Sequence, residues 1–118
     1  MTELLRSKEM AEKYRQHKDS GAMDDICVLC KAESIKEFIY WKIINNNFPY
    51  DLLAKQHHML VPVRHIREDQ ITAEEYNELL DIKANNLDVY DYIMEATPKA
   101  KSVPYHFHLH LIVGKQLK

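Results

Sequence analysis

Polar and apolar residues alternate strictly between positions 106 and 111, where the chain reads His-Phe-His-Leu-His-Leu. An alternation of period two predicts a β-strand, because successive side chains of a strand point to opposite faces. The two faces would carry His106, His108 and His110 on one side and Phe107, Leu109 and Leu111 on the other. A strand rises about 3.3 Å per residue, so neighbouring imidazoles lie roughly 6.6 Å apart and two of them could contact one phosphate or metal ion. The alternative is a solvated strand face that happens to carry histidines.

Weaker periodicities divide the rest of the chain into further elements. Helical spacing of apolar residues predicts helices over residues 3–18 and 72–96. Runs of β-branched and aromatic residues predict strands over 37–44 and 58–63, and residues 27–30 are expected to form a turn. Strands gathered around one long helix favour an α+β fold, in which a small antiparallel β-sheet packs with that helix and with a shorter N-terminal helix.

The helix over residues 72–96 is expected to be the longest. Thr72 and Glu75 form the capping-box pattern that opens a helix, and no further function is needed to explain them. The apolar residues that follow at helical spacing are Tyr76, Leu79, Leu80, Leu87, Tyr90 and Met94. Of these, the side chains expected to pack against the sheet are Tyr76, Leu80, Leu87 and Met94.

Composition narrows the class of protein. The 118 residues are 29% charged and 46% hydrophobic, which is typical of one soluble domain large enough to bury a core. The net charge of −2 gives no overall attraction to nucleic acid or to an anionic membrane, so phosphate binding must be local. The N-terminus lacks the apolar core of a signal peptide, and no apolar run reaches membrane-spanning length. We therefore expect a cytoplasmic protein, in which the two cysteines are thiols or metal ligands rather than a disulfide.

The histidine run has the pattern His-φ-His-φ-His-φ-φ, where φ is apolar, and resembles the motif of the histidine triad (HIT) superfamily. A second segment over residues 57–66, His-His-Met-Leu-Val-Pro-Val-Arg-His-Ile, is similar to the stretch His-x-Leu-Val-x-Pro-Lys-x-His of the same family. The resemblance covers roughly residues 25–114 and leaves residues 1–22 as an N-terminal helical extension of a single domain, 1–118. It implies a HIT-like α+β fold, often paired as a homodimer.

The family resemblance also implies a reaction. In HIT enzymes the middle histidine attacks the α-phosphate of a nucleotide conjugate, and water or another acceptor then resolves a nucleotidyl-histidine. Carried onto this chain, His108 is the nucleophile, His106 orients it, and His110 contacts the phosphate or the leaving group. Imidazole suits this role because its neutral form is a good nucleophile near pH 7. Backbone amides near Ser102 and Val103 are candidates for oxyanion contacts.

The pair Cys27 and Cys30 forms a C-x-x-C, which alone fits a redox pair, half of a zinc site or chance. A closed structural zinc site needs four nitrogen or sulfur ligands, and the histidines available to complete it are His57, His58, His65 and His106. Some HIT proteins, and the related galactose-1-phosphate uridylyltransferases, hold zinc in a layout that this chain resembles. The resemblance implies a structural zinc on Cys27, Cys30, His57 and His106. His58 is the rival to His57, because it lies one register step away.

Other candidate residues follow from the same comparison. Asn47 and Asp51 lie where HIT proteins usually place a side chain on the ribose hydroxyls, although neither has the usual spacing to His57. Many nucleotide-hydrolysing members carry Gly-Gln-Ser before the triad; here only Ser102 is shared, as a phosphate contact, with Lys99 and Lys101 nearby. His65 matches a family position, but a surface or hydrogen-bonded histidine explains it equally well. We expect His17 to be solvated and Trp41, Phe48 and Tyr50 to be core or strand residues, although these three could otherwise stack on a base.

These observations favour a hydrolase or nucleotidyl transferase that acts on a phosphoramidate or dinucleotide, with no nucleic-acid or membrane partner and with homodimerisation possible. A second reading is a zinc-braced module that binds a nucleotide without turning it over. A third is a metal site on the triad itself for redox or hydrolytic work, although such a site would usually recruit a carboxylate and none lies within the motif.

Overall fold

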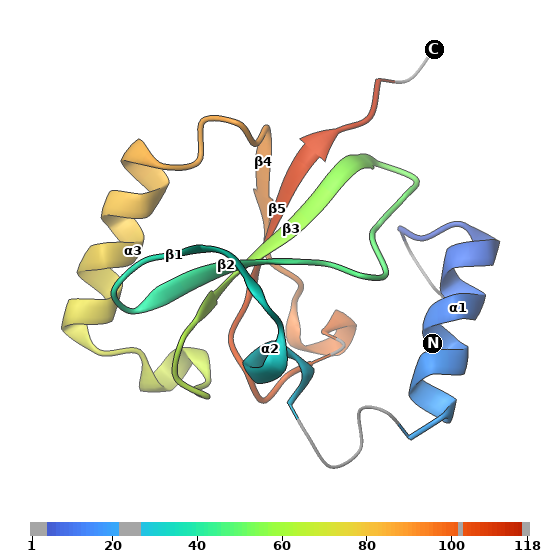
Figure 1. Cartoon of the computed structure of the whole chain (residues 1–118), viewed down its shortest axis with the longest axis horizontal. Helices are drawn as coiled ribbons and strands as arrows, with labels where there is room; N and C mark the ends of the chain where they lie inside the picture. The colour runs from blue at the N-terminus through green and yellow to red at the C-terminus, as the bar shows by residue number, and fades with distance from the viewer. Residues whose placement is uncertain (1–4, 22–26, 102, 117–118) are drawn as a thin grey trace.

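Five antiparallel strands form the centre of the fold, in the order β1-β2-β3-β5-β4 (Figure 1). The structure is a computed structural model that describes residues 5–21, 27–101 and 103–116. The strands are β1 Ser34–Glu37, β2 Trp41–Asn45, β3 Ala54–Pro62, β4 Tyr92–Met94 and β5 Leu109–Gly114. The helices are α1 Lys8–Asp19, α2 Val28–Lys31 and α3 Ala73–Asn85, with 3-10 turns at Glu68–Gln70 and Pro98–Ala100. The expected α+β fold with a small antiparallel sheet is confirmed.

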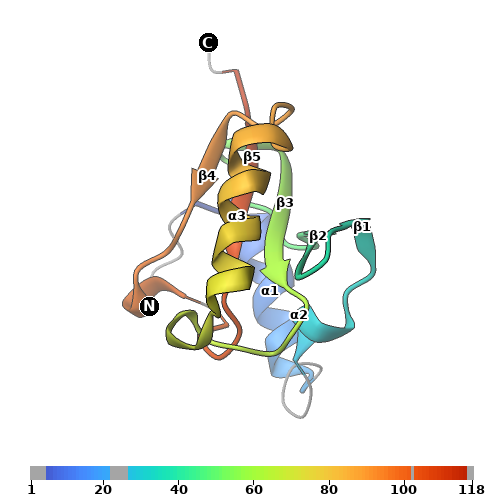
Figure 2. The same ribbon diagram turned by 90° about the vertical axis from the view of Figure 1, so that its left-hand side faces the viewer.

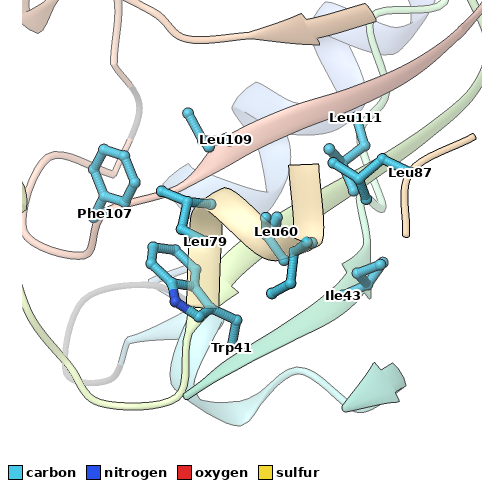
Figure 3. Packing of buried hydrophobic residues seen from close by; sticks show 9 residues of the cluster. Trp41, Ile43, Leu60, Leu79, Leu87, Phe107, Leu109 and Leu111 are labelled. Atoms are coloured by element: carbon cyan, nitrogen blue, oxygen red, sulfur yellow. The ribbon is translucent and has the colours of Figure 1, made fainter. Parts of the chain in front are cut away.

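Helix α3 covers one face of the sheet, and α1 and α2 lie on the other side (Figure 2). The core under α3 consists of nine buried residues: Trp41, Ile43, Leu60, Leu79, Ile82, Leu87, Phe107, Leu109 and Leu111 (Figure 3). The three apolar members of the alternating run share one face of the sheet, as predicted, and that face packs against α3. A smaller cluster on the α2 side contains Leu29, Ile44, Met59, Val61 and Val103. None of the described helices is both long enough and apolar enough to span a membrane.

The predicted helix over residues 72–96 is wrong in its extent and in its buried face. Helix α3 ends at Asn85, and residues 92–94 pair with β5 as the edge strand β4. Tyr76 and Leu80 are 51% and 53% exposed, whereas Leu79 is 3% exposed. Within α3 the buried stripe runs through Glu75, Leu79 and Ile82, one residue out of register with the predicted Tyr76 and Leu80. Leu87 is in the core as predicted, but it lies beyond the end of α3, and Met94 belongs to β4.

An ion pair between the buried Glu75 and the exposed Arg64 explains why this stripe was missed. The carboxylate of Glu75 accepts hydrogen bonds from Arg64 Nε at 2.9 Å and from an Arg64 terminal nitrogen at 2.8 Å. It also accepts from the backbone N–H of Thr72 at 2.9 Å, which completes the predicted capping box. These hydrogen bonds lower the pKa of Glu75 to about 2 and make burial of its charge tolerable. They also hold Arg64, the residue before His65, against the start of α3.

The strand predicted over residues 37–44 is split into the hairpin β1–β2. Residues 38–40 form the turn, in which the Phe38 N–H donates to the Trp41 carbonyl at 2.8 Å. These turn residues are hydrophobic, so composition gave no turn signal. The carboxylate of Glu78 in α3 accepts from the N–H groups of Ile39 and Tyr40 at 3.0 and 2.6 Å, and this long-range contact stabilises the turn.

The neighbours Leu79 and Leu80 provide a test of the packing. Leu79→Ala is expected to lower the free energy of unfolding by roughly 2–5 kcal/mol, because it empties a closely packed site under the sheet. Leu80→Ala is expected to change it by less than about 0.5 kcal/mol, because that side chain faces solvent. Urea denaturation of both variants measures the difference. An equal loss of unfolding free energy in both variants would contradict the burial of Leu79 and the exposure of Leu80.

Candidate functional site

A pocket of about 340 Å³ lies on the side of the sheet opposite α3. His108 and His110 line it together with residues of α2, of β2, and of the loop that follows β2. Helix α1 contributes Tyr14 and His17, and Arg6 precedes that helix. Two members of the triad therefore open into one pocket that also contains apolar side chains, among them Leu29, Ile44, Met59 and Val103.

His108 is held in one tautomer by the backbone. Its Nδ1 lies 2.9 Å from the carbonyl oxygen of His106, which can only accept, so Nδ1 carries the proton. The other ring nitrogen, Nε2, is then the one with a free electron pair. His108 is 5% exposed, and burial lowers its pKa, which keeps the ring neutral near pH 7. A neutral imidazole with a fixed Nδ1 proton is the form required of a nucleophile.

His57 and His110 form a second fixed arrangement beside His108. The Tyr50 backbone N–H donates to Nδ1 of His57 at 3.0 Å, so the proton of a neutral His57 resides on Nε2. That nitrogen lies 2.8 Å from Nδ1 of His110, which must accept. The His110 proton is therefore on Nε2, 3.4 Å from the Tyr50 hydroxyl. Burial lowers the pKa of His57 to about 4 and that of His110 to about 3, so both rings are neutral at pH 7.

The three triad histidines thus present different atoms. His108 offers a lone pair on Nε2, whereas His110 offers an N–H donor on Nε2. Their ring centroids are 5.2 Å apart, so one phosphate could receive both contacts. His106 does not line the pocket; its ring points to the cysteine pair.

A group of four metal-ligand side chains lies next to the pocket: Cys27, Cys30, His65 and His106. One donor atom from each of these side chains lies within 4.8 Å of the other three. Nδ1 of His106 is 3.3 Å from the Cys27 sulfur and 3.4 Å from the Cys30 sulfur, and Nδ1 of His65 is 3.2 Å from the Cys30 sulfur. Two thiols and two imidazoles are a donor set that can hold a metal ion.

The local structure positions this group. Cys27 begins the short helix α2, so the predicted turn at residues 27–30 is one helical turn. The buried Lys42 donates from Nζ to the carbonyls of Cys30 and Ala32 at 3.3 and 3.2 Å, which holds the end of that turn against β2. Nε2 of His106 lies 3.0 Å from the Pro62 carbonyl, so Nε2 carries the proton and Nδ1 is left to ligate.

The structure does not bring His57 to the cysteines, so the ligand set expected from the family resemblance requires correction. In the antiparallel register His57 lies opposite Ile112, whereas Pro62, at the end of β3, contacts His106. Position 65, three residues beyond β3, is therefore the one that reaches the cysteines. His58, the rival, lies on the other face of β3, with Nδ1 2.6 Å from the Tyr90 hydroxyl.

Of the two residues expected at the ribose hydroxyls, only Asn47 lines the pocket. Asp51 does not; its two carboxylate oxygens accept from the backbone N–H and the hydroxyl of Ser7, each at 2.6 Å. Ser102 lies outside the described residues, and Val103 lines the pocket. Trp41 belongs to the core, where its indole N–H donates to the Glu75 carbonyl at 2.8 Å, and Phe48 and Tyr50 line the pocket.

Three pocket residues were missed by the sequence analysis or read differently. Arg6 and Lys31 gave no motif, and His17 was read as a surface residue. His17 packs on Phe48 with 4.9 Å between ring centroids. The position of α1 over the loop after β2 reveals Arg6 and His17, and no local pattern encodes that position.

Comparison with known proteins agrees with this fold. A HIT family hydrolase from Clostridium thermocellum superposes with a TM-score of 0.58 at 21% identity, over 80% of this chain and 95% of that one. A HIT family hydrolase from Legionella pneumophila gives 0.55 at 21%, over 79% and 96%. A histidine triad protein from Clostridium difficile gives 0.54 at 21%, over 81% and 95%. No family model and no curated protein matches the sequence.

The arrangement of strands and helices therefore defines a HIT-fold protein. The resemblance that the histidine run indicated is confirmed at the level of the fold by neighbours that are HIT family hydrolases and histidine triad proteins.

Proposed function

We propose that this protein is a nucleotidyl hydrolase or transferase that works through a nucleotidyl intermediate on His108. The observation that carries the proposal is the hydrogen bond from His108 Nδ1–H to the His106 carbonyl, which leaves Nε2 as the nucleophilic atom in the pocket. His106 then orients the nucleophile through its backbone oxygen while its ring contacts the cysteines.

In the first step the Nε2 lone pair forms a bond to the α-phosphorus, and the bond from phosphorus to the leaving group breaks. The leaving group keeps the electron pair of that bond. The imidazole becomes positively charged as the new bond forms, and the His106 carbonyl stabilises that charge through the Nδ1 proton. The oxygen of water or of another acceptor then forms a bond to phosphorus and releases its proton to solvent. The P–N bond breaks, its electron pair returns to Nε2, and neutral His108 is restored.

The remaining pocket residues suit a nucleotide. His110 Nε2–H can donate to a phosphate oxygen or to the leaving group. The apolar side chains of Leu29, Ile44 and Met59 can cover a base, and Asn47 can reach ribose hydroxyls. The substrate would then be a nucleotide conjugate such as a phosphoramidate or a dinucleotide.

We further propose that the metal held by Cys27, Cys30, His65 and His106 is zinc. Thiolates and imidazoles in fours are its usual structural ligands, and a closed set leaves no position for substrate. A zinc ion there would hold the residues before β5 in place, two positions from His108. Its part in the reaction would be structural, and the chemistry would remain with His108.

Trapping the intermediate tests the proposal. Rapid mixing with a nucleoside phosphoramidate or a dinucleoside polyphosphate, followed by an alkaline quench, is expected to give protein heavier by one nucleotidyl group. Peptide mapping should place the group on His108, and His108→Asn should remain unmodified. A modified residue elsewhere would contradict the mechanism. Binding of nucleotides without adduct or turnover would favour a zinc-braced binding module instead.

A further inference from the structure

Cationic side chains line the pocket from three separate segments. Arg6 precedes α1, Lys31 ends α2, and Lys101 lies in the segment before β5. None of the described residues that line the pocket is a carboxylate. The charge of the described pocket wall therefore favours an anionic ligand.

His110 and the adjacent His57 add no positive charge at neutral pH, because burial holds their pKa values at about 3 and about 4. The cationic side chains that a bound phosphate could meet are therefore the arginine and the lysines, of which Lys101 also lies 4.0 Å from the Glu95 carboxylate. More than one such cation suits a ligand with more than one negative charge.

Two observations relate Arg6 to His110. The positive charge of Arg6 contributes to the lowered pKa of His57 and His110, although burial is the main cause. The Arg6 guanidinium also lies over the ring of Tyr50, 5.0 Å from its centroid, and the Tyr50 hydroxyl is next to His110. Arg6 is therefore the cation on the His110 side of the pocket, where a leaving group would depart.

The structure holds Arg6 in a fixed place. The residue is 9% exposed, its Nε donates to the Phe48 carbonyl at 2.7 Å, and its guanidinium lies 4.3 Å from the Tyr14 ring centroid. The Ser7–Asp51 hydrogen bonds anchor the next residue. Helix α1 contains no buried residue, so burial of a core face does not explain this anchoring. The anchoring keeps Arg6 and Tyr14 at the pocket.

We propose that Arg6 is a specificity-determining residue, which selects nucleotide conjugates whose leaving group is an anionic phosphate or polyphosphate over conjugates that release a neutral amine. This inference rests on the proposed nucleotidyl transfer to His108. When the P–O bond to a leaving phosphate breaks, the electron pair stays on that oxygen, and a guanidinium on the His110 side of the pocket stabilises the charge without giving up a proton. An amine leaving group needs a proton, which arginine does not supply.

A substrate pair tests the selectivity. Arg6→Gln is expected to lower kcat/KM for diadenosine triphosphate at least about tenfold more than for an adenosine 5′-phosphoramidate of an alkylamine. Arg6→Lys keeps the charge and should recover part of the preference. Arg15→Gln is the matched control, because Arg15 of α1 is exposed, pairs with Glu12 and does not line the pocket. The control should leave the ratio unchanged. If Arg6 were only a structural clamp, both substrates would lose rate equally, and the inference would be overturned.

Binding separates this inference from the proposed reaction. In the His108→Asn background, calorimetry with AMP and ADP is expected to show a gain of about tenfold in affinity for the added phosphate, which Arg6→Gln removes. Equal affinities for AMP and ADP would overturn the role of Arg6 even if the nucleotidyl adduct forms. An affinity gain that depends on Arg6, without any adduct or turnover in the wild type, would refute the reaction and leave the anion selectivity standing.

Discussion

Replacing His108 with alanine is expected to lower kcat on the order of 10³-fold or more and to leave nucleotide affinity nearly unchanged. The loss is large because the variant lacks the atom that forms the bond to phosphorus. Affinity is retained because base and ribose contacts would come from other pocket residues, such as Leu29, Ile44 and Asn47. Steady-state kinetics together with nucleotide titration measure both quantities. Retention of more than about a tenth of wild-type activity on every substrate would exclude His108 as the nucleophile.

Three neighbouring histidines serve as comparisons for this result. His110→Ala should slow the reaction less, because it removes one donor and leaves the attacking nitrogen. His106→Ala should lower both stability and rate if its ring holds zinc. His58→Ala is the control: this side chain contacts Tyr90 on the other face of β3, so turnover should hardly change.

The sequence predicted those parts of the fold whose signal is local. The alternation at 106–111 indicated correctly which side chains form the core, because a period of two depends only on the strand itself. The capping box at Thr72 was likewise predicted correctly from the sequence. The buried face of α3 was not, because it depends on Glu75, whose burial requires Arg64 from another segment. A carboxylate without a visible partner is expected to face solvent.

In the candidate metal site, too, some residues could be predicted from the sequence and one could not. Both cysteines and His106 were identified from their spacing and from the family resemblance, and the structure brings them together. The fourth member of the gathered group is His65 rather than the expected His57, because the choice between them depends on the register of β3 against β5. A change of register between two antiparallel strands changes which residues lie opposite each other, and the local sequence pattern does not determine that register.

The N-terminal segment could not be placed from the sequence at all. The pocket position of Arg6 results from contacts with Phe48 and Tyr50, more than forty residues away, and from the pairing of Ser7 with Asp51. The same pairing shows why the prediction for Asp51 is not supported by its contacts: its carboxylate binds the start of α1 rather than lining the pocket.

Purified protein is expected to contain about one zinc ion per chain, and removal of the ion is expected to lower stability by several kcal/mol. Zinc would connect α2, the segment after β3 and the segment before β5. Cys27→Ser and Cys30→Ser should each reduce the zinc content and the melting temperature. Elemental analysis and thermal unfolding with and without a chelator provide the measurements. Metal-free wild-type protein of unchanged stability would refute the zinc site.

The pair His65→Ala and His57→Ala decides which histidine completes the ligand set. His65→Ala should lose most of its zinc and become less stable, because Nδ1 of His65 lies 3.2 Å from the Cys30 sulfur. His57→Ala should keep a full zinc content, because its ring contacts Tyr50 and His110 instead. It should still lose activity, since Nδ1 of His110 would no longer have the donor that fixes its tautomer. Loss of zinc from His57→Ala, with zinc retained in His65→Ala, would restore the ligand set expected from the family resemblance and would show that the register of β3 is wrong.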